Sequence, residues 1–325
     1  MTSDNLFSRI LICATLFMLA FVFAVFLIVG ADGSKPADTS DTPAQTTPVV
    51  APSQQPDYIP FFDDGSAVID DAKLDAEYAL LMDMETGKVV ASRKGDSRIF
   101  PASMTKIMTM IVCCEQIADM NAKVSVSGDA IAAAYVEGAS CAGFTAGEQV
   151  TVLDLLYGVA LPSGADATGT LARYVAGSEA AFVELMNTKA GEMGLKNTHF
   201  VNASGLHHDN HYTTPREMAA IMAYAMDMEL CRTILSATTY TSGPTTQHPQ
   251  GVVMYSTGFS RMSATKFGAA QIVATKTGYT DEARFCFASY AETDSGRRYV
   301  LITAYGNDRY APVYDCKYVY ETFAK

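Results

Sequence analysis

"AQIVATKTGYT", Ala270 to Thr280, and "RFCFASYAETDSGRRYVLITAYG", Arg284 to Gly306, decide the fold class. Both are rich in β-branched and aromatic residues, and Asp294-Ser295-Gly296 divides the second one with a turn signal. Another hairpin is predicted where "YALLMDMETGKVVASRK", Tyr78 to Lys94, turns at Glu85-Thr86-Gly87-Lys88. Strands at both ends predict an α+β fold, in which one antiparallel sheet from both ends of the domain packs against a mostly helical layer.

Between these hairpins the hydrophobic pattern is mostly helical. Helices are predicted over Met104 to Met120, Val150 to Leu161, and Ser178 to Gly194. A further helix is marked by Thr214 as N-cap, Pro215 as first helical residue and Glu217 as the acid of a capping box. A last amphipathic helix is expected from Ala311 to Phe323.

Residues 1–66 are predicted to lie outside the folded domain, which we expect to cover residues 67–325. Ile10 to Val29 carry no charge, and a helix of that length spans about 30 Å, so residues 1–31 are expected to anchor the chain in the cytoplasmic membrane. A cleaved signal peptide is the alternative, because the small residues of "GADG" follow the apolar run. Residues 32–66 are rich in Pro, Thr and Ser, which predicts a disordered linker. Either alternative places the domain outside the cytoplasm.

Charge and cysteine content limit the possible partners. The net charge of -12 argues against nucleic acid, whose phosphates an acidic surface repels. Six of the seven cysteines lie beyond the apolar run, and an even number permits disulfides in an exported domain. Neither spacing nor domain size requires them, so buried thiols are favoured.

The stretch "PASMTK", Pro101 to Lys106, is an S-x-x-K pattern at the beginning of an apolar helix. Residues i and i+3 share a helix face, and a buried lysine has a lowered pKa, so Lys106 could accept a proton from Ser103. The alternative is a capping serine beside a solvated lysine. The S-x-x-K pattern by itself is weak evidence, because a chain of this length is expected to contain about one such pattern by chance. A second copy does occur, at Ser263 to Lys266.

Two more short motifs follow in the chain. Ser163-Gly164 comes after the break Leu161-Pro162, and Lys276-Thr277-Gly278 lies on a predicted strand. The order S-x-x-K, S-G-x, K-T-G is the set found in penicillin-binding proteins and serine β-lactamases. With the blocks "MDMETGKVV", "LPSGADA", "FVELMNTKAGEMGLKNTHFVNASGLHHDNHYTTPREMA" and "ATKTGYTDEA", the chain resembles serine D-alanyl-D-alanine carboxypeptidases of peptidase family S11, the low-molecular-weight penicillin-binding proteins. The likeness covers nearly all of residues 78–323.

This resemblance implies the serine β-lactamase/penicillin-binding-protein-like fold, and removal of the terminal D-Ala from peptidoglycan pentapeptide stems. Ser103 would form the acyl-enzyme, Lys106 would be the general base, and Ser163 would relay a proton to the leaving amine. The substrate-binding residues implied by the family are Lys276, Thr277, Gly278 and Tyr279. β-Lactam antibiotics are the implied inhibitors, and the family needs no cofactor or metal.

The roles on the K-T-G strand are also carried over from the family. Lys276 would support the proton relay, Thr277 would hold the terminal carboxylate, and residues 276–279 would pair with the peptide as an added strand. The backbone N–H groups of Ser103 and Tyr279 would form the oxyanion hole.

Two positions depart from the family pattern. Ala165 stands where the family usually has Asn, whose amide contacts the lysine and the peptide, and Arg284 stands where it usually has Gly. Arg284 would narrow the cleft or supply a second cation. These departures keep a weakly active or inactive wall-binding homologue as an alternative.

Other features suggest different chemistry. A β-lactamase is a further alternative, but no well-placed deacylating glutamate is evident, and Glu184 to Asn187 fit a half-exposed helix better. The cluster of His207, His208 and His211 suggests a metal site, although a variable polar loop is the favoured interpretation.

Overall fold

Strands from both ends of the domain meet in one seven-stranded sheet, which confirms the predicted fold class. The computed structural model describes residues 58–70 and 72–325. The strand order is β1-β3-β2-β11-β10-β9-β8, and all neighbours are antiparallel except β1 and β3. The bounds are β1 Ala67–Val68, β2 Tyr78–Asp83, β3 Val89–Arg93, β8 Lys266–Phe267, β9 Ala270–Thr280, β10 Arg284–Thr293 and β11 Arg298–Gly306.

Both predicted hairpins are confirmed, and glycine makes each turn possible. Gly87 (φ +69°) lies between β2 and β3, and Gly296 (φ +83°) lies between β10 and β11. Residues with a Cβ adopt this left-handed backbone only at a steric cost. The two hairpins are then joined where β2 pairs with β11, from Tyr78↔Ala304 to Asp83↔Tyr299.

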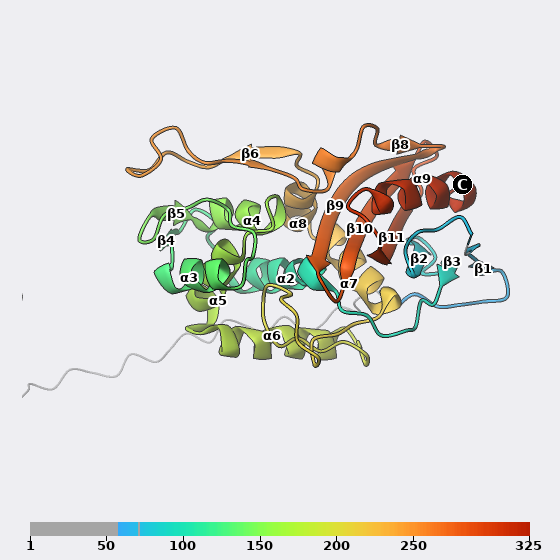
Figure 1. Ribbon diagram of the computed structural model, residues 1–325, viewed down its shortest axis with the longest axis horizontal. Helices are drawn as coiled ribbons and strands as arrows, with labels where there is room; N and C mark the ends of the chain where they lie inside the picture. The colour runs from blue at the N-terminus through green and yellow to red at the C-terminus, as the bar shows by residue number, and fades with distance from the viewer. Residues whose placement is uncertain (1–57, 71) are drawn as a thin grey trace, which may run out of the picture. The chain divides into compact units, whose positions relative to one another are not determined.

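Helices cover both faces of the sheet (Figure 1). α9 packs on one face and α7 on the other, and β2 is buried from both sides. Its Ala79 and Leu81 join the hydrophobic cluster under α9, whereas Leu80 and Met82 join the large cluster that includes α2 and α7. The bounds are α2 Lys106–Gln116, α3 Gly128–Val136, α4 Val152–Ala160, α5 Ala165–Ala176, α6 Glu179–Glu192, α7 Pro215–Asp227, α8 Glu229–Leu235 and α9 Ala311–Phe323.

The predicted helix boundaries hold for some helices and fail for others. The predicted N-cap of α7 is confirmed, because Thr214 accepts from the Glu217 N–H at 3.1 Å. Ser178, predicted only as the first residue of its helix, caps α6 by accepting from the Ala181 N–H at 3.1 Å. The capping-box role of Glu217 is wrong, because its carboxylate accepts from the Asn197 N–H and from the Thr198 hydroxyl instead. A tertiary contact has replaced the local one.

Two helices begin later than predicted. The expected Met104 to Met120 helix is a 3-10 turn, η1 Ala102–Thr105, followed by α2. The expected helix at Val150 loses its first residues to β5 Gln149–Thr151, which pairs with β4 Lys123–Ser125. A second small ribbon, β6 Thr239–Thr241 with β7 Val253–Tyr255, extends over α4 (Figure 1).

The end of the predicted linker contacts the domain. The Tyr58 hydroxyl donates to Asp227 at 2.9 Å, and the Phe61 N–H donates to the Gly87 carbonyl at 3.0 Å. The apolar run Ile10 to Val29 lies outside the described residues. Within the described residues, no helix is both long and apolar enough to cross a membrane.

Candidate active site

Ser103 and Lys106 lie on one short turn at the beginning of α2. In a 3-10 turn, with about three residues per turn, side chains i and i+3 eclipse each other, and Lys106 Nζ lies 3.0 Å from Ser103 Oγ. Lys106 is 2% exposed and also donates to the Ser204 carbonyl at 2.7 Å. Burial lowers the pKa of Lys106 to about 7, against the opposing effect of Asp166 and Glu179. Near neutral pH the amine can therefore accept a proton.

A second serine–lysine pair lies opposite the first. Lys276 on β9 is 1% exposed and donates to Ser163 Oγ at 2.8 Å and to the Thr277 carbonyl at 3.0 Å. Burial, with the nearby cations Lys106 and Arg261, holds the pKa of Lys276 well below its ordinary value. Ser163 has φ +63°, an uncommon backbone conformation for a residue with a side chain.

Gly278 allows β9 to lie directly against the turn that carries Ser103. A Cβ at this position would be 2.8 Å from the Pro101 carbonyl oxygen and 3.2 Å from the Ser103 nitrogen. Both contacts are with backbone atoms, which cannot move aside as a flexible side chain could. The third residue of the K-T-G motif therefore has a steric reason to be glycine.

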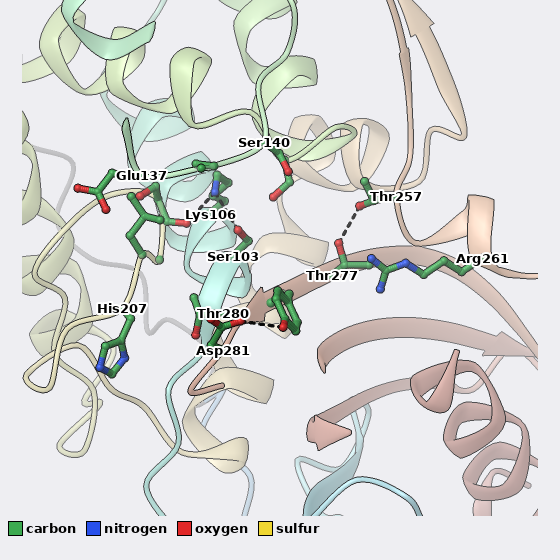
Figure 2. A pocket seen from close by; sticks show the side chains of 18 residues that line it. Ser103, Lys106, Glu137, Ser140, His207, Thr257, Arg261, Thr277, Thr280 and Asp281 are labelled. Atoms are coloured by element: carbon green, nitrogen blue, oxygen red, sulfur yellow. Dashed lines mark hydrogen bonds between the residues drawn. The ribbon is translucent and has the colours of Figure 1, made fainter. Parts of the chain in front are cut away.

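The two pairs open into a cleft of about 490 Å³. On one side of Ser103, Thr257 and Thr277 share a hydrogen bond of 2.7 Å, and Arg261 extends toward Thr277 (Figure 2). Glu137 and His207 lie on the other side (Figure 2). Ser103, Lys106, Ser163, Thr277, Gly278 and Tyr279 all line this cleft. Lys276 is not among the lining residues and reaches the cleft through Ser163.

One edge of β9 is available for pairing along the cleft. β10 pairs with β9 from Ala270 to Thr280, whereas β8 pairs with the opposite edge only at Ala270 and Gln271. Among the described strands, none pairs with this edge from Val273 onward. An extended peptide can add to such an edge through its main chain.

Three participants in this geometry were missed from the sequence. Thr257 and Arg261 precede β9 without a recognisable motif, Arg261 as the last residue of the 3-10 turn η2 Phe259–Arg261. The Ser204 group that accepts from Lys106 is a backbone carbonyl. Their proximity to Ser103 depends on long-range folding. No local sequence signal could have identified them.

The two departures from the family pattern differ in their structural setting. Ala165 is the first residue of α5 and is 8% exposed, close to Ser163. Arg284 does not line the cleft: its guanidinium donates to Asn307 at 2.7 Å and pairs with Glu77. The expectation that Arg284 narrows the cleft or supplies it with a second cation is therefore wrong.

Glu184 to Asn187 and the histidine cluster are the two features that suggested other chemistry. Glu184 is exposed on α6, and the Asn187 amide bonds both backbone groups of Phe200. His207 lies near Asp209 and Glu282, while His211 is buried. Within the described part of the chain, no group of three or more His, Cys, Asp or Glu side chains is arranged to hold a metal ion. All six cysteines there are free thiols.

Comparison with known proteins gives consistent matches. A family model described as D-alanyl-D-alanine carboxypeptidase, Peptidase_S11, matches residues 66–305. D-alanyl-D-alanine carboxypeptidase DacF of Bacillus subtilis is 33% identical over 228 residues, covering 70% of this chain and 57% of its own length. A D-alanyl-D-alanine carboxypeptidase of Streptomyces sp. strain K15 is 32% identical over 223 residues, covering 66% of this chain and 76% of its own. The chain thus spans little more than half of the Bacillus relative.

A solved structure also resembles the fold. The crystal structure of the Streptomyces K15 DD-transpeptidase superposes with a TM-score of 0.68 and 28% identity, covering 78% of this chain and 98% of that one. The likeness therefore extends over the sheet and the helical layer together.

Proposed function

The chain belongs to the D-alanyl-D-alanine carboxypeptidase family, and we propose that it removes the terminal D-Ala from peptidoglycan pentapeptide stems through an acyl-enzyme on Ser103. The observation that carries the proposal is the Lys106 amine, buried and 3.0 Å from Ser103 Oγ, with a pKa lowered to about 7. Such an amine can deprotonate a serine that lacks a histidine partner.

Acylation begins when neutral Lys106 takes the Ser103 proton and Ser103 Oγ attacks the carbonyl carbon of the penultimate D-Ala. The developing oxyanion would be bound by the backbone N–H groups of Ser103 and Tyr279, each such donor being worth about 3–4 kcal/mol in acyl transfer. The free edge of β9 supports this placement, since a peptide paired there runs past Ser103.

Departure of the terminal D-Ala requires a proton on its amine. Ser163, held by Lys276 at 2.8 Å, would deliver this proton, while Thr277 with Thr257 and Arg261 would bind the terminal carboxylate. A bound carboxylate favours the protonated form of Lys276, so substrate would restore the charge that burial disfavours. Water then hydrolyses the ester on Ser103.

Penicillin carries a carboxylate beside its reactive amide and would acylate the same serine. The proposed location is extracytoplasmic, with residues 10–29 as a membrane anchor, since this uncharged run is long enough to span a bilayer as a helix. Cell fractionation tests the anchor. Recovery in the membrane pellet supports it, and release into the medium indicates a cleaved signal.

The full-length chain in detergent would be incubated with a muropeptide pentapeptide while free D-Ala is measured, with Ser103→Ala as control. We expect D-Ala release from the parent protein and none from Ser103→Ala. Penicillin labelling without D-Ala release would instead favour the wall-binding homologue that Ala165 suggests, and rapid turnover of the penicillin adduct would indicate a β-lactamase.

A further inference from the structure

His211 is a buried titratable group for which the proposed mechanism has no use. It is 2% exposed, and both ring nitrogens are engaged. The Val201 N–H donates to Nδ1 at 3.2 Å, and Nε2 lies 2.8 Å from Thr105 Oγ1. A backbone N–H can only donate, so Nδ1 carries no proton, and the neutral ring must hold its proton on Nε2 and donate it to Thr105.

Thr105 lies between the nucleophile and the base in sequence, and its hydroxyl faces the loop that carries His211. This loop, residues 199–212, is closed by two backbone hydrogen bonds between His199 and Tyr212. Thr105 is fully buried. Its side chain packs closely on the loop, since a Cβ added to Gly205 would lie 2.9 Å from Thr105 Oγ1. The nucleophile turn and the 199–212 loop are thus in direct contact.

Two further hydrogen bonds join the same pair of segments. Lys106 Nζ donates to the Ser204 carbonyl at 2.7 Å, and Thr109 Oγ1 donates to the Ala203 carbonyl at 2.6 Å. A neutral amine has two N–H bonds and one lone pair. When the Ser204 carbonyl accepts one N–H, it restricts the direction in which the lone pair can point, and Ser103 Oγ lies 3.0 Å away.

We infer that His211 is a positioning residue for acylation: its Nε2–H holds Thr105, and thereby keeps the Ser204 carbonyl where it orients the Lys106 amine toward Ser103. Burial, assisted by the neighbouring histidines and Lys106, lowers the pKa of His211 to about 3, so the ring stays in the required neutral form at neutral pH. This inference rests on the proposed function, since it concerns the rate at which Ser103 is acylated.

The test measures the first-order rate of Ser103 acylation by a fluorescent penicillin and the apparent Kd of the preceding complex, on full-length protein. Thr105→Val keeps the shape of the side chain and removes the hydroxyl, and Thr105→Ser restores the hydroxyl. His211→Phe removes both ring nitrogens, and His208→Phe makes the same change at an exposed position of the loop as matched control. Thermal midpoints report on folding.

We expect Thr105→Val and His211→Phe each to slow acylation roughly tenfold to a hundredfold, as small misplacements of reacting groups do, with Kd changed less than twofold. Thr105→Ser should recover most of the rate, and His208→Phe should keep it. The double variant should be no slower than the slower single variant, because both changes remove one contact.

Two outcomes overturn the inference: full-rate acylation in a folded Thr105→Val protein, or a double variant whose loss equals the product of the single losses. If His211→Phe does not fold, the acylation rates of Thr105→Val and Thr105→Ser decide whether the inference holds. Failure of penicillin to acylate the parent protein would instead contradict the proposed function.

Discussion

The chain contains the same four-residue pattern twice, and the two copies have opposite surroundings. Ser103 and Lys106 lie on a buried 3-10 turn with their polar atoms 3.0 Å apart. Ser263 and Lys266 lie at the surface, where Lys266 bonds Asp294 at 2.7 Å. The pattern alone therefore carries no chemistry. Removal of the lysine from water, which disfavours its charged form, makes one copy a candidate base.

Replacing the serines gives the largest contrast between the two copies. Ser103→Ala removes the attacking oxygen and should abolish both penicillin labelling and D-Ala release. Ser263→Ala should leave both unchanged. Intact-protein mass spectrometry after penicillin treatment would show the adduct, and equal labelling of both variants would refute the assignment of the nucleophile.

The lysines provide the next contrast. Lys106→Ala removes the proposed general base, so the acylation rate should fall by about 10²–10⁴, the range typical of positioned proton transfer. Lys266→Ala, outside the cleft, should acylate at the parent rate. Stopped-flow fluorescence with a labelled penicillin measures both, and a Lys106→Ala protein that keeps its parent rate would exclude Lys106 as the base.

The pH dependence of the rate tests the desolvation argument. Only the neutral amine accepts a proton, and burial lowers the pKa of Lys106 to about 7, so acylation should rise as pH increases through about 7. Below that pH the rate should change by about tenfold per unit, since the neutral fraction does so. A rate that is constant between pH 5 and 8 would show that Lys106 is not the titrating base.

Restoring the family asparagine should give a smaller effect near the first copy. The resemblance implies that the amide of Ala165→Asn would contact Lys106, and Ala165 borders a cavity of about 240 Å³ that could hold the longer side chain. One added hydrogen bond is worth about 1 kcal/mol, so turnover should rise about fivefold. D-Ala release compared with the matched variant Ala165→Ser measures this, and an unchanged rate would mean that Ala165 is not limiting.

The smallest effect is expected in the second copy. Its ion pair, Lys266 with Asp294, is exposed on both sides, and such pairs contribute about 0–1 kcal/mol. Lys266→Ala should therefore change the free energy of unfolding by less than about 0.5 kcal/mol. Urea denaturation checks this, and a loss of several kcal/mol would reveal a structural role for this copy.

Local chemistry explains which parts of the fold were predictable. The turns at Gly87 and Gly296 and the cap at Thr214 each depend on neighbours within a few residues, and all three predictions are confirmed. α5 was not predicted, because Gly164 offers it no capping side chain. Glu217 failed as a capping-box acid because residues from another part of the chain compete for its carboxylate.

The residues of the site likewise fall into those that local sequence motifs predict and those that depend on long-range folding. Ser103, Lys106, Ser163 and Lys276 were found through short motifs, and their side chains meet in pairs. Arg261, by contrast, reaches the cleft only through the path of the segment before β9, and the Ser204 contribution is a backbone oxygen that residue identity does not encode. The 3-10 form of the turn that carries Ser103 was also not predicted, since its apolar pattern resembles that of an α-helix.

The free edge of β9 has a consequence for which substrates the proposed carboxypeptidase can distinguish. Recognition by main-chain pairing depends on the extended form of the ligand and is insensitive to most side chains, so stems that differ at their third residue should be accepted alike. Amides of residues 277–279 that are not already bonded to β10 should also become protected from hydrogen exchange when penicillin occupies the cleft. The proposed carboxypeptidase would then recognise a stem peptide by its terminal residues rather than by the residues that precede them.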